Sequence, residues 1–482
     1  MQESKVVRQI TAMDGRERER LRQFVNSPYF NRHAATATLL DFVLKELGRS
    51  KPRLTEERAQ AALANTKSGQ SLADLQSGLM KLINKFLAIE QLQQEPFREE
   101  VLTVKRTKAL HRERLLDNRG KRLDNKIARH HFRDAATHLA AYEWKNINGY
   151  RQVNKKRTDT REMQAMLNHL DRFYLVEKLR HACQLTANMM MMATHYDLIF
   201  LEPILEYLDG EAGRELLKSG KEPSIDAYYH TLMTMRDPED ATHYQRITYY
   251  LEDGVEKLPE NHRRDIYGFA SNYCITRVMS GHANYRTELL DLYRRGLTTG
   301  LIYEQGEISE FDYKNIVTIA AANGEFDWTE RFMEENRDRL PADRRENAYA
   351  LNKANYLYRR GKLKEAAQLL VTVTDSDVVY HLARVLLEVR IAYDQSDSDY
   401  ALGLLETFRL YVTRSRRINT KDKKSYNNYV RYTKQLVSLK ALRGFTDKES
   451  YARKLSSLRS GVEKADQIKE KAWLLQELEA IK

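Results

Sequence analysis

Ala350 to Leu370 reads ALNKANYLYRRGKLKEAAQLL and has the pattern of two short helices joined by a tight turn. In its first half, small and apolar residues recur at spacings of three and four and share one helix face: Ala350, Ala354, Leu357 and Tyr358. Gly361 then supplies a turn position without a Cβ. The second half has a matching face: Leu363, Ala366, Ala367 and Leu370. The stretch therefore predicts two closely packed antiparallel helices.

The same stretch resembles the tetratricopeptide (TPR) pattern of repeated helix pairs. Ala354, Gly361 and Ala366 stand where that family has a small residue, a glycine and an alanine, and apolar residues follow at Leu370 and Val373. The resemblance implies a right-handed α-solenoid of degenerate TPR-like helix pairs. In such a solenoid the first helix of each pair lines a concave face that binds a protein or peptide. The family's tryptophan, leucine and proline are replaced here by Ala350, Lys353 and Val378.

Similar segments on either side support a repeat array. Ala401 lies 35 residues after Ala366, Gly324 lies 37 residues before Gly361, and Gly281 precedes Gly324 by 43. Because one helix pair cannot bury its apolar faces alone, we expect these neighbours to stack. We predict an array over residues 160–482 with helix pairs at about 224–257, 261–298, 308–340, 343–374, 377–414 and 422–460, closed by a capping helix at about 462–481.

Composition favours helices nearly throughout the 482 residues, since the chain has only 8 prolines and 20 glycines and 31% of its residues are charged. The N-terminus lacks the apolar core of a signal peptide, and the longest apolar runs are too short to span a bilayer. We therefore expect a cytoplasmic protein with no membrane partner. The two cysteines, Cys183 and Cys274, each lie in an apolar helical pattern and are predicted to be core thiols.

Residues 1–96 are predicted to form a helical N-terminal domain. Asp14 and Glu17 have the spacing of a capping box, and further helices are expected at about 32–47, 55–64 and 71–91. The pentapeptide SPYFN at Ser27–Asn31 and the segment SLADLQSGLMKLINKFL at Ser71–Leu87 resemble the opening of a family of uncharacterised bacterial helical proteins. This resemblance implies no activity.

The same N-terminal helices have two interpretations. If they form a winged-helix unit, four side chains would face a DNA groove: Gln76, Lys81, Asn84 and Lys85. If they form a helical cap on the solenoid, these side chains are solvated. The seven residues between the two motif helices exceed the usual three or four and favour the cap.

Residues 97–159 form a basic segment, predicted to consist of long helices with a break at Asn118–Gly120. Between Val101 and Arg161 there are 17 Lys and Arg against 6 Asp and Glu, whereas the whole chain has a net charge of +12. Such a local excess attracts polyanions, whether RNA, DNA or an acidic protein surface, although charge of this density normally marks a solvated helix surface. Arg151–Thr160 is the expected exposed connection. The candidate polyanion-binding residues are Lys121, Arg122, Lys155, Lys156 and Arg157.

Sequence motifs of catalysis are lacking: there is no GxxxxGK[ST], GxGxxG, HExxH, GxSxG or CxxC. His130 and His131 are adjacent, so on a helix their rings diverge and cannot readily share a metal. The methionines Met189–Met192, expected to begin a second helix after one that starts at Thr160, point in different directions and are predicted to fill the core. We therefore predict no enzyme activity, no cofactor and no metal, and keep a hydrolase or transferase in the N-terminal half as a third interpretation.

Binding is the remaining function class. Tyrosines number 28 against 14 phenylalanines, and many lie in the repeat helices. We predict a non-catalytic protein-binding scaffold or adaptor that uses the concave face of the array, and nucleic-acid binding by the basic segment as the alternative. The candidate partner-binding residues, placed on the first helices of the pairs, are Tyr228, Tyr273, Asn315, Asn352, Asn355 and Arg384.

Overall fold

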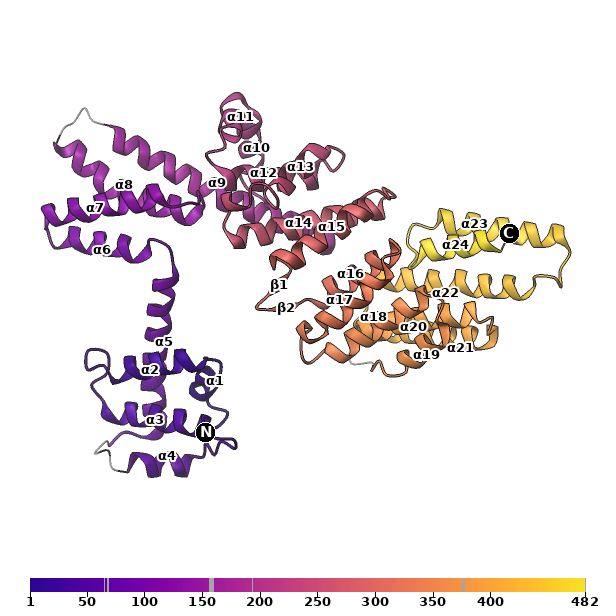
Figure 1. Cartoon of the computed structure of the whole chain (residues 1–482), viewed down its shortest axis with the longest axis horizontal. Helices are drawn as coiled ribbons and strands as arrows, with labels where there is room; N and C mark the ends of the chain where they lie inside the picture. The colour runs from indigo at the N-terminus through magenta and orange to yellow at the C-terminus, as the bar shows by residue number, and fades with distance from the viewer. Residues whose placement is uncertain (65, 67–68, 156–159, 193, 375–377, 482) are drawn as a thin grey trace. The chain divides into compact units, whose positions relative to one another are not determined.

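The structure of the protein is a computed structural model that describes residues 1–64, 66, 69–155, 160–192, 194–374 and 378–481. Over these ranges the chain forms 24 α-helices, two 3-10 turns and one two-stranded hairpin (Figure 1). The predicted all-α class is therefore confirmed. Among the helices in these ranges, none combines the length and apolarity that crossing a bilayer requires.

The chain divides into two compact units. The first comprises Met1–Leu232 with Glu256–Pro259, and the second comprises Met233–Val255 with Glu260–Lys482. The division into 1–96, 97–159 and 160–482 stays a prediction. The first unit contains α1 (Lys5–Thr11), α2 (Gly15–Asn26), α3 (Ala34–Leu47), α4 (Glu56–Leu63), α5 (Leu72–Gln94), α6 (Arg98–Ala109), α7 (Glu113–Arg129), α8 (Ala135–Lys155), α9 (Arg161–Met192), α10 (Leu201–Asp209), α11 (Glu211–Lys218) and most of α12 (Pro223–Arg236).

The second unit continues with further helix pairs and one hairpin. Its elements are α13 (Ala241–Tyr249), α14 (Glu260–Met279), α15 (Tyr285–Thr299), β1 (Tyr303–Glu304), β2 (Glu307–Ile308), α16 (Glu310–Ala322), α17 (Phe326–Asn336), η2 (Arg337–Arg339), α18 (Arg345–Arg359), α19 (Leu363–Leu370), α20 (Val378–Asp394), α21 (Ser398–Arg414), α22 (Thr420–Ala441), α23 (Lys448–Lys464) and α24 (Lys471–Ala480), with η1 (Val255–Lys257) at the boundary. The two strands pair antiparallel, with Tyr303 opposite Ile308.

The N-terminal helices α1–α5 bury one apolar cluster, to which Leu39, Leu79 and Ile83 each contribute a fully buried side chain. The predicted capping box is confirmed at the start of α2: the Glu17 N–H donates to Asp14 Oδ1 at 2.8 Å, and the Asp14 N–H donates to Glu17 Oε2 at 2.9 Å. In the described part of residues 1–96, the helices are joined by turns and loops, and no strand occurs. These residues therefore do not form the β-hairpin that a winged-helix unit needs.

In the basic segment, the predicted break at Asn118–Gly120 is wrong, because α7 runs unbroken through these residues. The chain turns earlier, between α6 and α7, where His111 has a φ of 53°. Gly120 is instead a contact position: it is buried, and the indole of Trp144 from α8 occupies the space that a Cβ would take. A glycine without a side chain thus permits close helix approach here and does not end the helix.

Two further boundaries differ from expectation. Helix α9 continues to Met192, so Met189 lies in its last turns and does not begin a second helix. Residues 161–192 contain neither glycine nor proline, so nothing in the backbone interrupts the helix. Arg151 lies within α8 and not in an exposed connection, with 11% of its side chain exposed and ion pairs to Glu113 and Asp117.

The helix pairs of the second unit repeat one turn geometry. Between the two helices of a pair, a residue adopts a left-handed φ: 78° at Gly324, 74° at Gly361 and 59° at Ser396. At each turn the next N–H donates to a carbonyl five residues earlier, as in a Schellman motif: Glu325 to Ala320, Lys362 to Leu357 and Asp397 to Ala392, at 2.9–3.0 Å. Five residues after each left-handed position comes a fully buried side chain: Thr329, Ala366 and Ala401. The predicted helix pairs α16–α17, α18–α19 and α20–α21 are confirmed.

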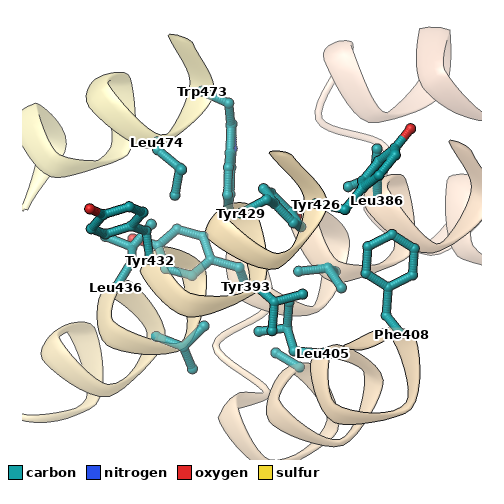
Figure 2. Packing of buried hydrophobic residues seen from close by; sticks show 14 of the residues in the cluster. Leu386, Tyr393, Leu405, Phe408, Tyr426, Tyr429, Tyr432, Leu436, Trp473 and Leu474 are labelled. Atoms are coloured by element: carbon teal, nitrogen blue, oxygen red, sulfur yellow. The ribbon is translucent and has the colours of Figure 1, made fainter. Parts of the chain in front are cut away.

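Aromatic side chains close the C-terminal core of this unit (Figure 2). Tyr393 from α20 and Trp473 from α24 meet edge to face, with ring centroids 5.5 Å apart, and Tyr429 from α22 lies 6.3 Å from the same indole. Leu474 and Leu478 of α24 are also buried in this cluster. Together these contacts fix the last helix against α20 and α22.

Candidate binding groove

The second unit contains a groove formed by the first helices of successive pairs. Helix α16 packs on α18 and α18 packs on α20, while α20 and α22 share the C-terminal core. A cavity of about 400 Å³ opens along these helices. Its lining comes from α16, α18, α20, α22 and the turns before α22 and α24, and includes Lys314, Leu351, Asn352, Asn355, Leu382, Leu386, Leu387, Arg390, Arg417, Ile418, Asp422, Tyr426, Lys469 and Glu470. Its volume lies within the range of pockets that hold small ligands or peptide side chains.

The floor of the groove is apolar. Leu382, Leu386 and Ile418 are each 7% exposed, so they belong to the core but keep an edge toward the cavity. Tyr426 is similar at 8% and packs edge to face on Phe408, with ring centroids 5.7 Å apart (Figure 2). Burial, followed by the charge of Asp422, raises the pKa of Tyr426 to about 12, so this phenol stays neutral near pH 7.

Cations surround this floor. Arg390 forms an ion pair with Glu470. Lys314, Arg417 and Lys469 have no carboxylate partner among the residues that the structure describes. The Lys469 ammonium lies 5.4 Å from the centre of the Tyr426 ring, a cation–π contact that places it beside the floor. Among the described residues, the groove thus has an apolar base and an edge with three cations that form no ion pair.

The surroundings of Lys314 disfavour its positive charge in the free protein. Its side chain keeps contact with water, yet protein atoms crowd it, and the resulting desolvation lowers its pKa. The positive charge of Lys469 lowers the pKa further. An anion bound near both lysines would offset their repulsion and compensate for the lost hydration of Lys314.

Two of the predicted partner-binding residues line this groove. Asn355 is half-buried, and its amide has no hydrogen-bond partner among the described residues. Asn352 is 5% exposed and donates through Nδ2 to the Ala348 carbonyl at 2.8 Å, so it stabilises its own helix. Asn355 is therefore the better placed of the two to bind a ligand, since it offers both a donor and an acceptor.

The other four predicted partner-binding residues lie elsewhere. Tyr228 has no exposed surface, and Tyr273 is 6% exposed and donates through its hydroxyl to the Pro238 carbonyl at 2.9 Å. The expectation that these two tyrosines contact a ligand does not fit this burial. Asn315 lines a separate hollow of about 570 Å³ beside the β1–β2 hairpin. Arg384 is outside the lining of the groove and binds Glu388 one turn along α20, at 2.9 Å.

Sequence reasoning did not identify the cations of the groove. Lys314, Arg417 and Lys469 lie in α16 and in two interhelix turns, far apart in the chain. No local spacing connects them, and each looks like an ordinary solvated charge in its own segment. Only the stacking of the helices brings them to one cavity.

The basic segment of the first unit has a separate positive surface. Among the described residues of this segment, five cations form ion pairs with carboxylates: Arg98, Lys105, Lys126, Lys145 and Arg151. Seven others on α6, α7 and the turn between them are exposed and have no ion-pair partner among the described residues: Arg106, Lys108, Arg112, Arg114, Lys121, Arg122 and Arg129. The predicted residues Lys156 and Arg157, and the side chain of Lys155, lie outside the described residues.

Helix α7 concentrates part of this charge on one face. Leu116, Gly120, Leu123 and Ile127 form its buried side. At 100° per residue, Arg114, Lys121, Arg122 and Arg129 fall on the opposite side, together with Asn118 and Asn125. This outward face of α7 therefore carries four cations and no carboxylate.

The first unit also contains a buried cluster of titratable side chains. His138 contacts Glu222 through Nε2 at 2.8 Å and His169 through Nδ1 at 3.1 Å, and Arg172 binds the second oxygen of Glu222 at 2.8 Å. Desolvation, followed by the charges of His138 and Arg172, lowers the pKa of His169 to about 4. The network ties α8, α9 and the residue before α12 together.

In the described ranges, no three His, Cys, Asp or Glu side chains gather in a way that could hold a metal ion. His130 and His131 lie just after α7 ends, and not on a helix face as expected. Cys183 and Cys274 are buried free thiols, as predicted.

In comparisons with known proteins, no family model, no curated protein and no solved structure matches this chain. The TPR-like and SPYFN resemblances therefore stay predictions.

Proposed function

We propose that the protein is a non-catalytic binding scaffold whose second unit is a right-handed solenoid of degenerate TPR-like helix pairs. Three consecutive pairs with one turn geometry, recurring after 37 and 35 residues, support the repeat interpretation. The packing of α16 on α18 and of α18 on α20 agrees with first helices that form a common face. In this proposal the common face is the concave one.

The observation that carries the proposed function is the groove itself. It combines an apolar floor with the half-buried side-chain amide of Asn355, which forms no hydrogen bond with another described residue. A peptide backbone offers the N–H and C=O groups that such an amide binds, and apolar side chains of the peptide would cover the floor. We therefore propose that the groove holds a peptide segment of another protein.

The test is a phage-displayed library of random dodecapeptides, panned on the full chain. Asn355→Trp should fill the groove and abolish binding of most recovered peptides. Lys364→Ala, an exposed position on the second helix of the same pair, should leave binding unchanged. If no recovered peptide distinguishes Asn355→Trp from the unaltered chain, the groove does not bind peptides. Circular dichroism of each variant checks that the fold is retained.

Nucleic-acid binding by the first unit is the second candidate function. The outward face of α7, with its four cations and two asparagines, supports it, because a helix face without carboxylates suits a phosphate backbone. Affinity for unrelated RNA and DNA 20-mers should fall about 10³-fold or more between 50 and 200 mM salt if six or more phosphates are bound. Replacing Lys121 and Arg122 by glutamine should reduce this dependence. If no binding occurs even at 50 mM salt, the face is only solvated.

A further inference from the structure

We propose that the groove selects acidic peptides, with carboxylates bound by Lys314, Arg417 and Lys469 and neighbouring apolar side chains seated on the floor. This inference rests on the proposed peptide-binding function and adds the chemical class of the partner. It names three binding residues that sequence patterns did not indicate.

The charged side chains of the groove lining do not balance. The lining contains four cations and two carboxylates, a difference of +2. Arg390 and Glu470 neutralise each other, and Asp422 lies in the first turn of α22, where the Asn419 amide donates to it at 2.7 Å and the helix N-terminus favours its charge. The remaining positive charge among the described residues belongs to Lys314, Arg417 and Lys469, and an anionic ligand would compensate it.

These three cations also lie at one cavity. Three different elements supply them, yet they border one cavity, and Lys314 and Lys469 lie close enough for one charge to disfavour the other. Surface lysines usually extend into water, whereas Lys469 lies beside the aromatic ring of Tyr426, and both lysines border the same cavity. A carboxylate between them would accept charge-assisted hydrogen bonds from both, and Arg417 offers a planar donor fork for a second one.

The composition of the groove floor favours a peptide over a nucleic acid as the ligand. Bound nucleotides of single strands stack on exposed aromatic faces. The groove has one aromatic residue in its lining, Tyr426, which is 8% exposed and lies beside Lys469. The rest of the floor is aliphatic, from Leu382, Leu386 and Ile418. A peptide segment in which Asp or Glu alternates with apolar residues would fit this groove. Its apolar side chains would cover the aliphatic floor, its backbone would bind the Asn355 amide, and its carboxylates would bind the cations.

The experiment extends the dodecapeptide panning. Peptides that bind the full chain but not Asn355→Trp define the groove-dependent set, and their Asp and Glu content is compared with that of the unselected library. We expect clear enrichment of Asp and Glu. For synthetic peptides from this set, Lys469→Gln should weaken binding about tenfold or more, the loss expected for one hydrogen bond to a charged group. Replacing the peptide's Glu and Asp by Gln and Asn should have a similar effect.

Two controls separate this groove from other positive surfaces. Lys364→Gln removes an exposed cation on α19 and should leave affinity unchanged, as should the pair Arg114→Gln and Lys121→Gln on α7. If a groove-dependent set exists but shows no acidic enrichment, the inference is wrong while the peptide-binding function stands. If no such set exists, both fail. If a U20 oligonucleotide displaces the peptides and its own binding is lost in Lys469→Gln, the groove binds nucleic acid instead.

Discussion

Gly120 offers the sharpest test of the packing described for the first unit. It lies in the middle of α7, and a Cβ placed there would overlap the six-membered ring of Trp144. The indole has little freedom to move, because it is 3% exposed and its Nε1 donates to Asp124 at 2.8 Å. Gly120→Ala must therefore displace the indole, break its hydrogen bond or separate α7 from α8.

The expected change in the free energy of unfolding combines one stabilising contribution with two destabilising ones. Alanine is favoured over glycine within a helix by about 1 kcal/mol. Overpacking a close contact costs about 1–3 kcal/mol, and losing the indole hydrogen bond adds about 1 kcal/mol. We expect a net loss of about 1–3 kcal/mol. The matched control is Gly403→Ala in α21, where an added Cβ meets nothing within 4 Å and the exposed helix should gain stability.

Hydrogen–deuterium exchange of the full chain provides the readout, because it reports opening of α7 and α8 separately from the second unit. Gly120→Ala should accelerate exchange in both helices, and Gly403→Ala should slow it in α21. If Gly120→Ala protects α7 as Gly403→Ala protects α21, the close approach of Trp144 to Gly120 is incorrect. Gly120 would then be an ordinary helix position, without a side-chain contact that excludes a Cβ.

Three further predictions concern single side chains. His169 has a pKa of about 4 in the folded chain and about 6.5 in the unfolded chain, so the unfolded chain takes up the proton first as the pH falls. The free energy of unfolding should therefore decrease between about pH 6.5 and 4, by less than about 3 kcal/mol because the ring keeps some contact with water. In urea unfolding measured across this pH range, His169→Gln should weaken the pH dependence. Ala366→Phe should cost about 1–3 kcal/mol by overpacking a fully buried position, whereas Gln368→Phe on the exposed side of α19 should cost little. Burial raises the pKa of Cys274 to about 12, so the native thiol should resist dithionitrobenzoate at pH 8 and react after unfolding; rapid labelling of the native chain would contradict its burial.

Part of the candidate site could be read from the sequence. The apolar spacing around Gly361 predicted the helix pair and the position of Asn355 on its first helix, because helical periodicity is a local property. Tyr228 and Tyr273 have the same periodicity, yet the structure buries them. Periodicity assigns a residue to a face of its helix, but whether that face meets solvent or another helix depends on the neighbours.

The sequence by itself determined the all-helical class, most helix pairs in the second unit, the Asp14 capping box and the excess of positive charge in the basic segment. Each of these follows from local spacing, composition or capping chemistry. Tertiary structure alone decided that α7 continues through Gly120, since the glycine serves a contact with Trp144 from another helix. It also decided that Lys314, Arg417 and Lys469 border one groove. Stacking of separate helices creates both features, and the information for such contacts is spread over residues too distant in the chain for any local pattern to reveal.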